Sequence, residues 1–242
     1  EPGRLVFSLM LRKDHLIWLE RRDGLDRIKV RRLSDGAEHS VDFAEEAYDI
    51  TLLNGSEFDT TTIRFEYSSM TTPAETYDYD IVTRQRSLRK RQFLPSGHDP
   101  ANYVTRRLHA TATDGERVPV TLLYRKGLAL DGLAPVLLEG YGSYGSSTYP
   151  TFDATRLSLA DRGLVYALAH VRGGRERGER WYRDGRREKK VNTFTDFLAV
   201  ARFLVEQKIA GKGRIVAMGA SAGGLLMGAV TNMRPDLMKA VI

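Results

Sequence analysis

The sequence predicts a chain of two parts, an antiparallel β-rich first half and an α/β half with a doubly wound, mainly parallel sheet. Short alternating apolar runs closed by Asp-Gly turns recur up to residue 93, whereas strand-like and helix-like segments alternate after residue 105. A connector with two prolines and one glycine, residues 94–104, separates the two patterns. We therefore predict one domain over residues 1–93 and a second over residues 105–242.

The first half has the pattern of a β-meander. Two of its turns are Asp23-Gly24 and Asp35-Gly36, a pairing that favours tight reversals of the chain. Strands at such close spacing are typical of a propeller, a sandwich or a barrel. The residues alone leave these architectures open, together with a small independent sheet. The predicted strands are His15–Glu20, Arg27–Leu33, Tyr48–Leu53, Thr62–Tyr67 and Thr76–Val82.

The second half alternates strands with helices, which predicts a parallel sheet covered by helices on both faces. Leu164–Ala169 is almost continuously apolar, as expected for a strand buried on both sides. Thr193 is expected to cap the clearest helix, with Asp196 three residues further on. The other predicted strands are Val118–Tyr124, Pro135–Leu138 and Arg214–Met218, and the predicted helices are Ala154–Asp161, Thr193–Gln207 and Ala222–Met233.

The composition of the chain limits its function classes. Of its 242 residues, 42% are hydrophobic and 28% charged, which fits a globular protein. No apolar run approaches the roughly 20 residues that cross a bilayer, so no membrane partner is expected. The absence of cysteine excludes disulfides, thiolate catalysis and cysteine-based zinc sites, and it suits a cytoplasmic location. The start at Glu1 has neither an initiator Met nor a signal-peptide layout and suggests a chain cut at this end.

The net charge is +6, and two stretches, Arg84–Arg91 and Arg172–Lys190, are basic. Nucleic-acid binding would be one reason for such charge. However, neither stretch carries an aromatic-basic RNA motif, and acidic residues interrupt the second, namely Glu176, Glu179, Asp184 and Glu188. We therefore interpret both stretches as solvated faces or intramolecular pairs and predict no nucleic-acid partner.

Gly219-Ala220-Ser221-Ala222-Gly223 fits the pattern G-x-S-x-G. An apolar strand leads into it and an apolar helix leaves it, which is the setting of the nucleophile elbow in α/β-hydrolases. A phosphate-binding loop would place a Lys after its last Gly, whereas Leu225 follows Gly224. We predict Ser221 as the nucleophile. The sharp turn also requires small neighbours, and the candidates are Gly219, Ala220, Ala222, Gly223 and Gly224.

A serine hydroxyl is a weak nucleophile unless a base takes its proton. In α/β-hydrolases the chain order is Ser, then the acid, then His. All five histidines precede Ser221, and we interpret His170, at the end of a central strand, as structural. Asp236 is the one Asp after Ser221 and is interpreted as a local capping residue. The triad Asp and His are therefore expected beyond Ile242.

Several segments, in matching order, resemble the prolyl oligopeptidase family and, within it, oligopeptidase B. The similarity spans most of residues 60–242, and residues 1–60 match more loosely. The segments are Tyr67–Pro73, Gly140–Gly145, Arg156–Gly163, His170–Gly174, Trp181–Gly185, Lys189–Phe194 and the elbow, Gly219–Gly224.

This resemblance implies a fold, an activity and a site. The fold is the closing strands of a seven-bladed β-propeller, followed by the first half of an α/β-hydrolase domain. The activity is that of a serine oligopeptidase acting on short peptides after Arg or Lys, through an acyl-enzyme on Ser221. The backbone N–H of Ala222 and the hydroxyl of Tyr141 match the two oxyanion donors, and Tyr144 would line the substrate pocket. No metal and no cofactor are implied.

The chain also departs from the family. Glu139 stands where close relatives usually have an aromatic residue, and Arg175 and Arg177 stand where many have Gly and a hydrophobic or aromatic residue. Arg172-Gly173-Gly174 is expected to shape a structural loop near the site. Two alternatives stay open, a prolyl- or acylaminoacyl-specific peptidase of the same fold, and a truncated, inactive fragment that serves at most as a binding module. The oligomeric state is not indicated.

Overall fold

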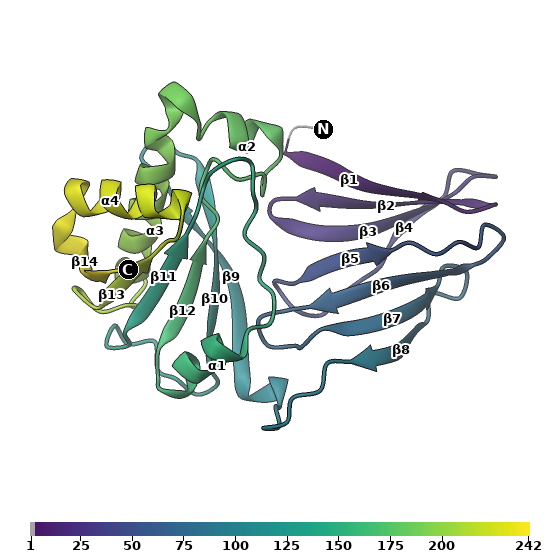
Figure 1. Ribbon diagram of the computed structural model, residues 1–242, viewed down its shortest axis with the longest axis horizontal. Coiled ribbons are helices and arrows are strands. Elements are labelled where there is room, and N and C mark those ends of the chain that lie inside the picture. The colour runs from purple at the N-terminus through teal and green to yellow at the C-terminus, as the bar shows by residue number, and fades with distance from the viewer. Residues whose placement is uncertain (1–2) are drawn as a thin grey trace.

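The computed structural model describes residues 3–242, which form three β-sheets (Figure 1). Two four-stranded sheets from the first half of the chain lie at one side of the molecule. A six-stranded sheet with its helices lies at the other side. The predicted change from an antiparallel β-rich half to an α/β half is therefore present in the structure.

Each four-stranded sheet is an antiparallel meander whose strands follow chain order. The predicted strands correspond to β2 (His15–Arg22), β3 (Leu25–Arg32), β5 (Asp49–Leu53), β6 (Thr62–Ser68) and β7 (Glu75–Asp80). The prediction missed β1 (Arg4–Leu11), β4 (Glu38–Ser40) and β8 (Arg86–Arg91). Strand β8 is exposed along its whole length, so it shows no apolar alternation. The two sheets share one apolar core, which includes Ile17, Ile28, Val30, Ile50, Ile63 and Phe65.

Asp49 begins β5 in a half-buried position and leads to a pH-dependent prediction. Burial raises the pKa of Asp49 to about 6, and the nearby charge of Asp26 adds to this effect. Because the folded pKa lies above the ordinary value of 3.8, Asp49 favours folding at low pH, and stability is lost as the pH rises through about 6. Replacing Asp49 with Asn should therefore raise the free energy of unfolding by about 1–2 kcal/mol at pH 7.5.

Urea denaturation at two pH values checks this prediction. The gain from Asp49→Asn should fall to about a third at pH 4.5, since most of the wild-type carboxyl is then protonated. Asp59→Asn is the control, because that carboxylate is exposed and pairs with Lys13 at the surface. An equal gain at both pH values would show that burial of the charge is not the cause.

The six-stranded sheet has the order β14-β13-β11-β12-β10-β9. Strands β11, β12, β13 and β14 run parallel, whereas β10 pairs antiparallel with both β9 and β12. The sheet is thus mainly parallel, as predicted, although β9 and β14 were missed. Polar residues interrupt any apolar pattern in β9, and β14 is only four residues long. The strands are β9 (Tyr103–Thr111), β10 (Arg117–Arg125), β11 (Val136–Gly140), β12 (Val165–Ala169), β13 (Ile215–Met218) and β14 (Met238–Val241).

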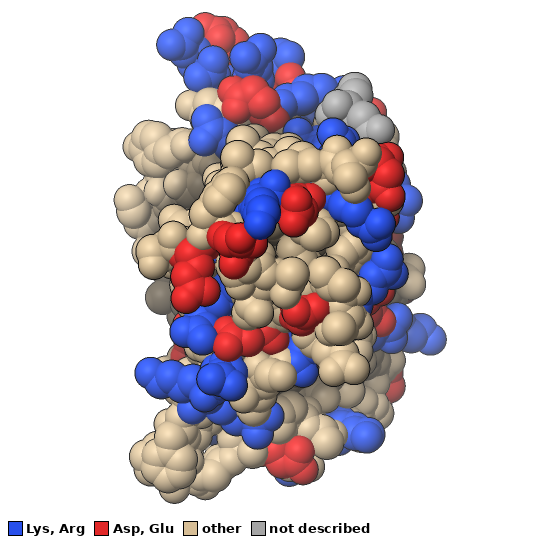
Figure 2. Space-filling model, turned by 90° about the vertical axis from the view of Figure 1, so that its right-hand side faces the viewer, with Lys and Arg blue, Asp and Glu red and all other residues tan. Residues whose placement is uncertain are grey.

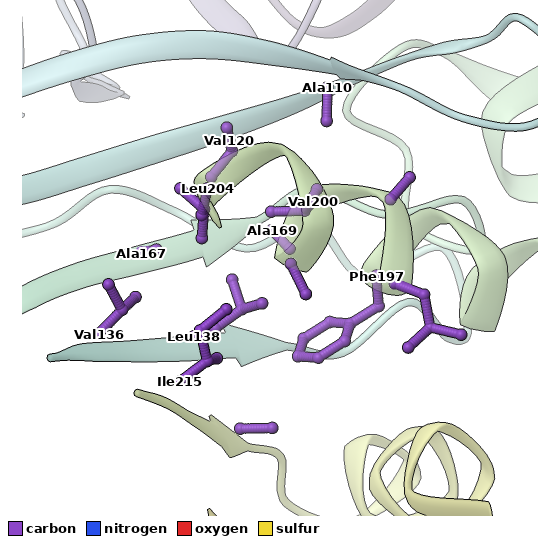
Figure 3. Packing of buried hydrophobic residues seen from close by; sticks show 14 of the residues in the cluster. Ala110, Val120, Val136, Leu138, Ala167, Ala169, Phe197, Val200, Leu204 and Ile215 are labelled. Carbon is purple, nitrogen blue, oxygen red and sulfur yellow. The ribbon is translucent and has the colours of Figure 1, made fainter. Parts of the chain in front are cut away.

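Helices cover both faces of this sheet. α3 (Val191–Glu206) and α4 (Ala222–Met233) share one apolar cluster with Val165, Ala167 and Ala169 of β12. The alternate residues Tyr166 and Leu168 belong instead to the cluster of α1 (Ala154–Asp161). A short helix, α2 (Glu179–Arg183), precedes α3. In Figure 3 the buried side chains of α3 lie over those of the sheet; the labelled ones are Phe197, Val200 and Leu204 of α3 with Ala110, Val120, Val136, Leu138, Ala167, Ala169 and Ile215.

The predicted cap of α3 is wrong. The helix begins at Val191, and no side chain caps its start. The Thr193 hydroxyl donates instead to the carbonyl of Arg172 at 2.7 Å, and the Asp196 carboxylate binds the Arg172 guanidinium. Both side chains point at the loop after β12. Leaving the buried guanidinium of Arg172 without a carboxylate would cost more free energy than leaving the helix start without a side-chain cap.

The turn between β6 and β7 ties the two halves together. Met70 of this turn is fully buried in the cluster formed by Leu123, Tyr166 and Leu168 of the six-stranded sheet. The carboxylate of Glu45 holds the turn by accepting hydrogen bonds from four hydroxyls, those of Tyr67, Ser69, Thr71 and Thr72. Tyr67–Pro73, one of the segments that resemble the family, thus connects the small sheets with the six-stranded sheet.

Charges of both signs are interspersed on the surface. Figure 2 shows Asp and Glu lying among Lys and Arg on the face at the side of the small sheets. In the first basic stretch, Arg89 pairs with Asp78 and Arg91 pairs with Glu75, which agrees with its interpretation as solvated or paired. Within residues 3–242, no helix has the length and apolar character needed to cross a membrane.

Candidate active site

The site is built on the tight turn between β13 and α4. Ser221 occupies this turn with φ 56° and ψ −120°, a backbone conformation that is strained for any residue other than Gly. Its side chain is exposed. The strand, turn and helix predicted around the G-x-S-x-G pattern are therefore all present, with the serine at the strained position.

At two positions around Ser221 the structure leaves no room for a side chain. A Cβ added to Gly219 would lie 2.6 Å from the carbonyl oxygen of Gly223, and a Cβ on Gly223 would lie 2.9 Å from that of Gly140. Gly224 is different, since the nearest atom to its added Cβ would be 3.9 Å away. The expectation of tight packing thus holds for Gly219 and Gly223 and is wrong for Gly224.

Ser221, Ala222 and Tyr144 line one open hollow of about 590 Å³. Ala222 is the first residue of α4, so its backbone N–H has no partner within the helix. Tyr144 is 74% exposed, which leaves its ring free to contact a bound molecule. The hollow is completed by residues that no sequence motif had marked as site residues, namely Ser143, Tyr182, Gly185, Arg186, Arg187, Lys190 and Leu225.

Tyr141 lies beside the elbow, although it does not line the hollow itself. Its Cδ2 would be 3.6 Å from a Cβ on Gly223, so the ring packs against the start of α4. Among residues 3–242, its hydroxyl has no hydrogen-bond partner and is free to donate to a ligand.

The loop that carries Tyr141 and Tyr144 is held by backbone contacts. Gly173, with φ 104°, approaches so closely that a Cβ on it would lie 1.9 Å from the carbonyl oxygen of Gly142. The Gly145 amide donates to the Gly173 carbonyl at 2.9 Å. From the start of α3, the Lys190 ammonium donates to the carbonyl of Gly142 at 2.5 Å and to the hydroxyl of Ser143 at 2.8 Å. These contacts fix the loop relative to Ser221.

Arg172 anchors the adjoining loop from inside the protein. It is 3% exposed and forms a two-pronged ion pair with the fully buried Asp196, while its remaining nitrogen binds Asp114 at 2.5 Å. Burial disfavours the charge of Arg172, but the hydrogen bonds to the two carboxylates hold its pKa above the ordinary value. The expected structural role of this loop thus has a physical basis.

His170 and Asp236 both have local partners. His170 is buried, with Nε2 2.8 Å from the Thr121 hydroxyl and Nδ1 3.2 Å from that of Thr148. Asp236 forms an ion pair with Arg234 at 2.7 Å instead of a cap. Neither lines the hollow, and none of its described lining residues is His, Asp or Glu. Within residues 3–242, neither an imidazole nor a carboxylate therefore faces this hollow as the base of a serine triad.

Two family models match the chain. The prolyl oligopeptidase N-terminal β-propeller domain matches residues 3–92, and the prolyl oligopeptidase family model matches residues 150–242. The chain belongs to the prolyl oligopeptidase family. The two four-stranded sheets are accordingly propeller strands, and the six-stranded sheet is that of an α/β-hydrolase domain, which confirms the predicted fold class. The boundaries drawn at residues 93–94 and 104–105 stay a prediction.

Relatives in the prolyl oligopeptidase family are longer proteins. Dipeptidyl aminopeptidase BI of Pseudoxanthomonas mexicana is 49% identical over 92% of this chain and 31% of its own length. Protease 2 of Moraxella lacunata is 37% identical over 95% of this chain and 33% of its own length. Oligopeptidase B from Leishmania major has a similar structure, with a TM-score of 0.88 and 38% identity over 99% of this chain and 35% of that chain. The chain thus spans about a third of the length of these relatives.

The three departures from the family pattern all have partners. Glu139 accepts a hydrogen bond from the Tyr166 hydroxyl. The guanidinium of Arg175 lies over the ring of Tyr182, 5.1 Å from its centre. Arg177 forms ion pairs, both at 3.1 Å, with Asp23 and Glu116. Glu139 therefore belongs to the packing of β11 against β12, and Arg175 and Arg177 belong to the packing of the loop before α2.

Proposed function

We propose that the whole natural protein is a serine peptidase that hydrolyses short peptides through an acyl-enzyme on Ser221. The observation that carries this proposal is the strained, exposed serine at the β13–α4 turn. Family membership supports it, because the relatives described above are named as peptidases.

In the proposed reaction, Ser221 Oγ bonds to the scissile carbonyl carbon and loses its proton to a base. The N–H of Ala222 and the hydroxyl of Tyr141 hold the oxyanion, each contributing roughly 3–4 kcal/mol to the transition state. The C–N bond then breaks as the amine takes the proton, and water releases the acyl group. Tyr144 contacts the substrate in the hollow. The base and its orienting acid would come from residues outside 3–242, as the family resemblance implies.

The hydroxyl of Tyr141 gives a direct prediction. Replacing Tyr141 with Phe should lower kcat about 100-fold with little change in KM, because the donor acts mainly on the oxyanion. Steady-state hydrolysis of a short peptide amide measures both constants. Tyr149→Phe, in the same loop, is the control and should stay within about twofold. Equal losses in both variants would contradict the role of Tyr141.

The finer proposal is cleavage after Arg or Lys, supported by the similarity to oligopeptidase B. Rates on Arg-, Pro- and acetyl-Ala-amides test it, and the Arg-amide should be fastest by at least about tenfold. A faster Pro- or acetyl-Ala-amide would favour a prolyl- or acylaminoacyl-specific peptidase.

A second candidate is removal of dipeptides from a free N-terminus, favoured by the 49% identical relative named dipeptidyl aminopeptidase BI. Comparing a free with an acetylated N-terminus on the same peptide distinguishes it, since an aminopeptidase requires the free amine. A protein that turns over neither peptides nor an activated ester would instead be the binding module. The cytoplasmic location expected from the lack of cysteine stays a prediction.

A further inference from the structure

Three cations line the hollow beside Ser221, namely Arg186, Arg187 and Lys190. Arg186 and Lys190 are half-buried, and Arg187 is exposed. Within the described part of the chain, none of them forms an ion pair with a carboxylate, and no Asp or Glu lines the hollow. The positive charge in this hollow is therefore not balanced by residues 3–242.

The rest of the same basic stretch behaves differently. Its other cations each pair with a carboxylate, so the sequence-based interpretation is correct for them. The three cations without a carboxylate partner line the hollow of the nucleophile. In the sequence they follow Asp184, after which the stretch contains one acidic residue, Glu188. The pairs are Arg172–Asp196, Arg175–Glu179, Arg177–Glu116, Arg180–Asp184, Arg183–Glu179 and Lys189–Asp184.

Two of the three cations are held in place by neutral groups. The Arg186 guanidinium lies over the Tyr182 ring, 4.7 Å from its centre, and donates to the Tyr182 hydroxyl at 3.2 Å. Lys190 is fixed by its two bonds to the Tyr144 loop, both to uncharged acceptors. Neutral partners position these groups without cancelling their charge, so an arriving anion would meet a preorganised site.

Two helix starts add to this positive charge. Lys190 is the N-cap of α3 and Ser221 is the N-cap of α4, and neither helix has an acidic residue in its first turn. A helix N-terminus carries a partial positive charge and normally favours Asp or Glu nearby. A lysine at this position reinforces the positive potential, which an anionic ligand would relieve.

We propose that Arg186, Arg187 and Lys190 form an anion-binding wall that takes a carboxylate of the peptide bound at Ser221. This inference rests on the proposed function for the identity of the bound peptide. A carboxylate can accept two charge-assisted hydrogen bonds from such a wall. It can come from the peptide C-terminus or from an acidic side chain. An Arg or Lys side chain would be repelled here, so a basic residue before the scissile bond would be held in another part of the site.

Binding to the Ser221→Ala form of the whole natural protein tests the wall without requiring catalysis. Three acetylated peptides of one sequence are compared by titration calorimetry: a neutral one ending in Gln-amide, one ending in Glu-amide and one ending in Gln with a free carboxylate. At least one acidic peptide should bind about tenfold more tightly than the neutral one, which equals about 1.4 kcal/mol. The peptide with the larger gain identifies the source of the carboxylate.

Substitution of the wall completes the test. Arg186→Gln with Arg187→Gln should remove most of the tenfold preference, whereas Lys190 is left intact because it also holds the Tyr144 loop. Arg84→Gln is the matched control, since Arg84 also has a positive φ, 61° against 51° for Arg187, and lies in the remote β7–β8 turn. Equal binding of all three peptides, or a preference that survives the double substitution, would overturn the proposal. Wild-type turnover is measured in parallel, so a protein that binds but does not hydrolyse would refute the peptidase activity and not the wall.

Discussion

Replacing Ser221 with Ala is expected to lower kcat for short peptides about 10⁵-fold or more in the whole natural protein. Without the hydroxyl no acyl-enzyme forms, and the oxyanion donors alone leave little residual rate. The fold should be unaffected, because Ala at φ 56° carries the same backbone strain as Ser. Steady-state kinetics and thermal unfolding of the same preparations check both parts.

Ser158→Ala is the control for this prediction. Ser158 lies in α1, far in sequence from the elbow, and its hydroxyl accepts a hydrogen bond from the Arg162 guanidinium. Its loss should leave kcat within about twofold and stability within about 0.5 kcal/mol. Residual turnover of Ser221→Ala above a hundredth of the wild-type rate would mean that another group is the nucleophile.

Replacing Arg172 with Met is expected to cost about 3–5 kcal/mol of unfolding free energy. The substitution leaves the Asp196 carboxylate, which is 0% exposed, in the interior without its partner. Urea denaturation measures the loss directly. Peptide hydrolysis should also fall, since the Arg172 loop packs against the loop of Tyr141 and Tyr144.

Two further variants separate the buried charge from the lost side chain. Adding Asp196→Leu to Arg172→Met removes the stranded carboxylate and should recover at least about half of the loss. Arg175→Met, three residues along the same loop, breaks a half-exposed pair with Glu179 and a contact with the Tyr182 ring, and should cost about 1 kcal/mol. A similar cost for Arg172→Met and Arg175→Met would show that burial does not govern the pair.

The elements found from sequence are those in which an apolar segment is bounded by clear turn residues. α1 and α4 begin and end where predicted, and Ala222–Met233 also sits directly after a recognisable turn. Ser221 could be selected because strand, small residues and helix all surround it within a short stretch. Local patterns of this kind are visible without knowledge of the fold.

Contacts between distant residues could not be predicted in the same way. Asp196 binds Arg172 across 24 residues, so its spacing from Thr193 wrongly indicated a cap. Strand β8 is exposed throughout and has a single apolar residue, Leu88, so it shows no apolar alternation. The charges of Arg186 and Arg187 looked like others in their stretch, and only the packing of the loop after α2 brings them to the hollow of Ser221.

The role of Ser221 as the nucleophile is tested most directly by covalent labelling of the whole natural protein with a fluorophosphonate, followed by peptide mapping. We expect one adduct per chain, on the peptide that contains Ser221, and no adduct in the Ser221→Ala variant. Labelling at another residue, or undiminished labelling after the substitution, would contradict it.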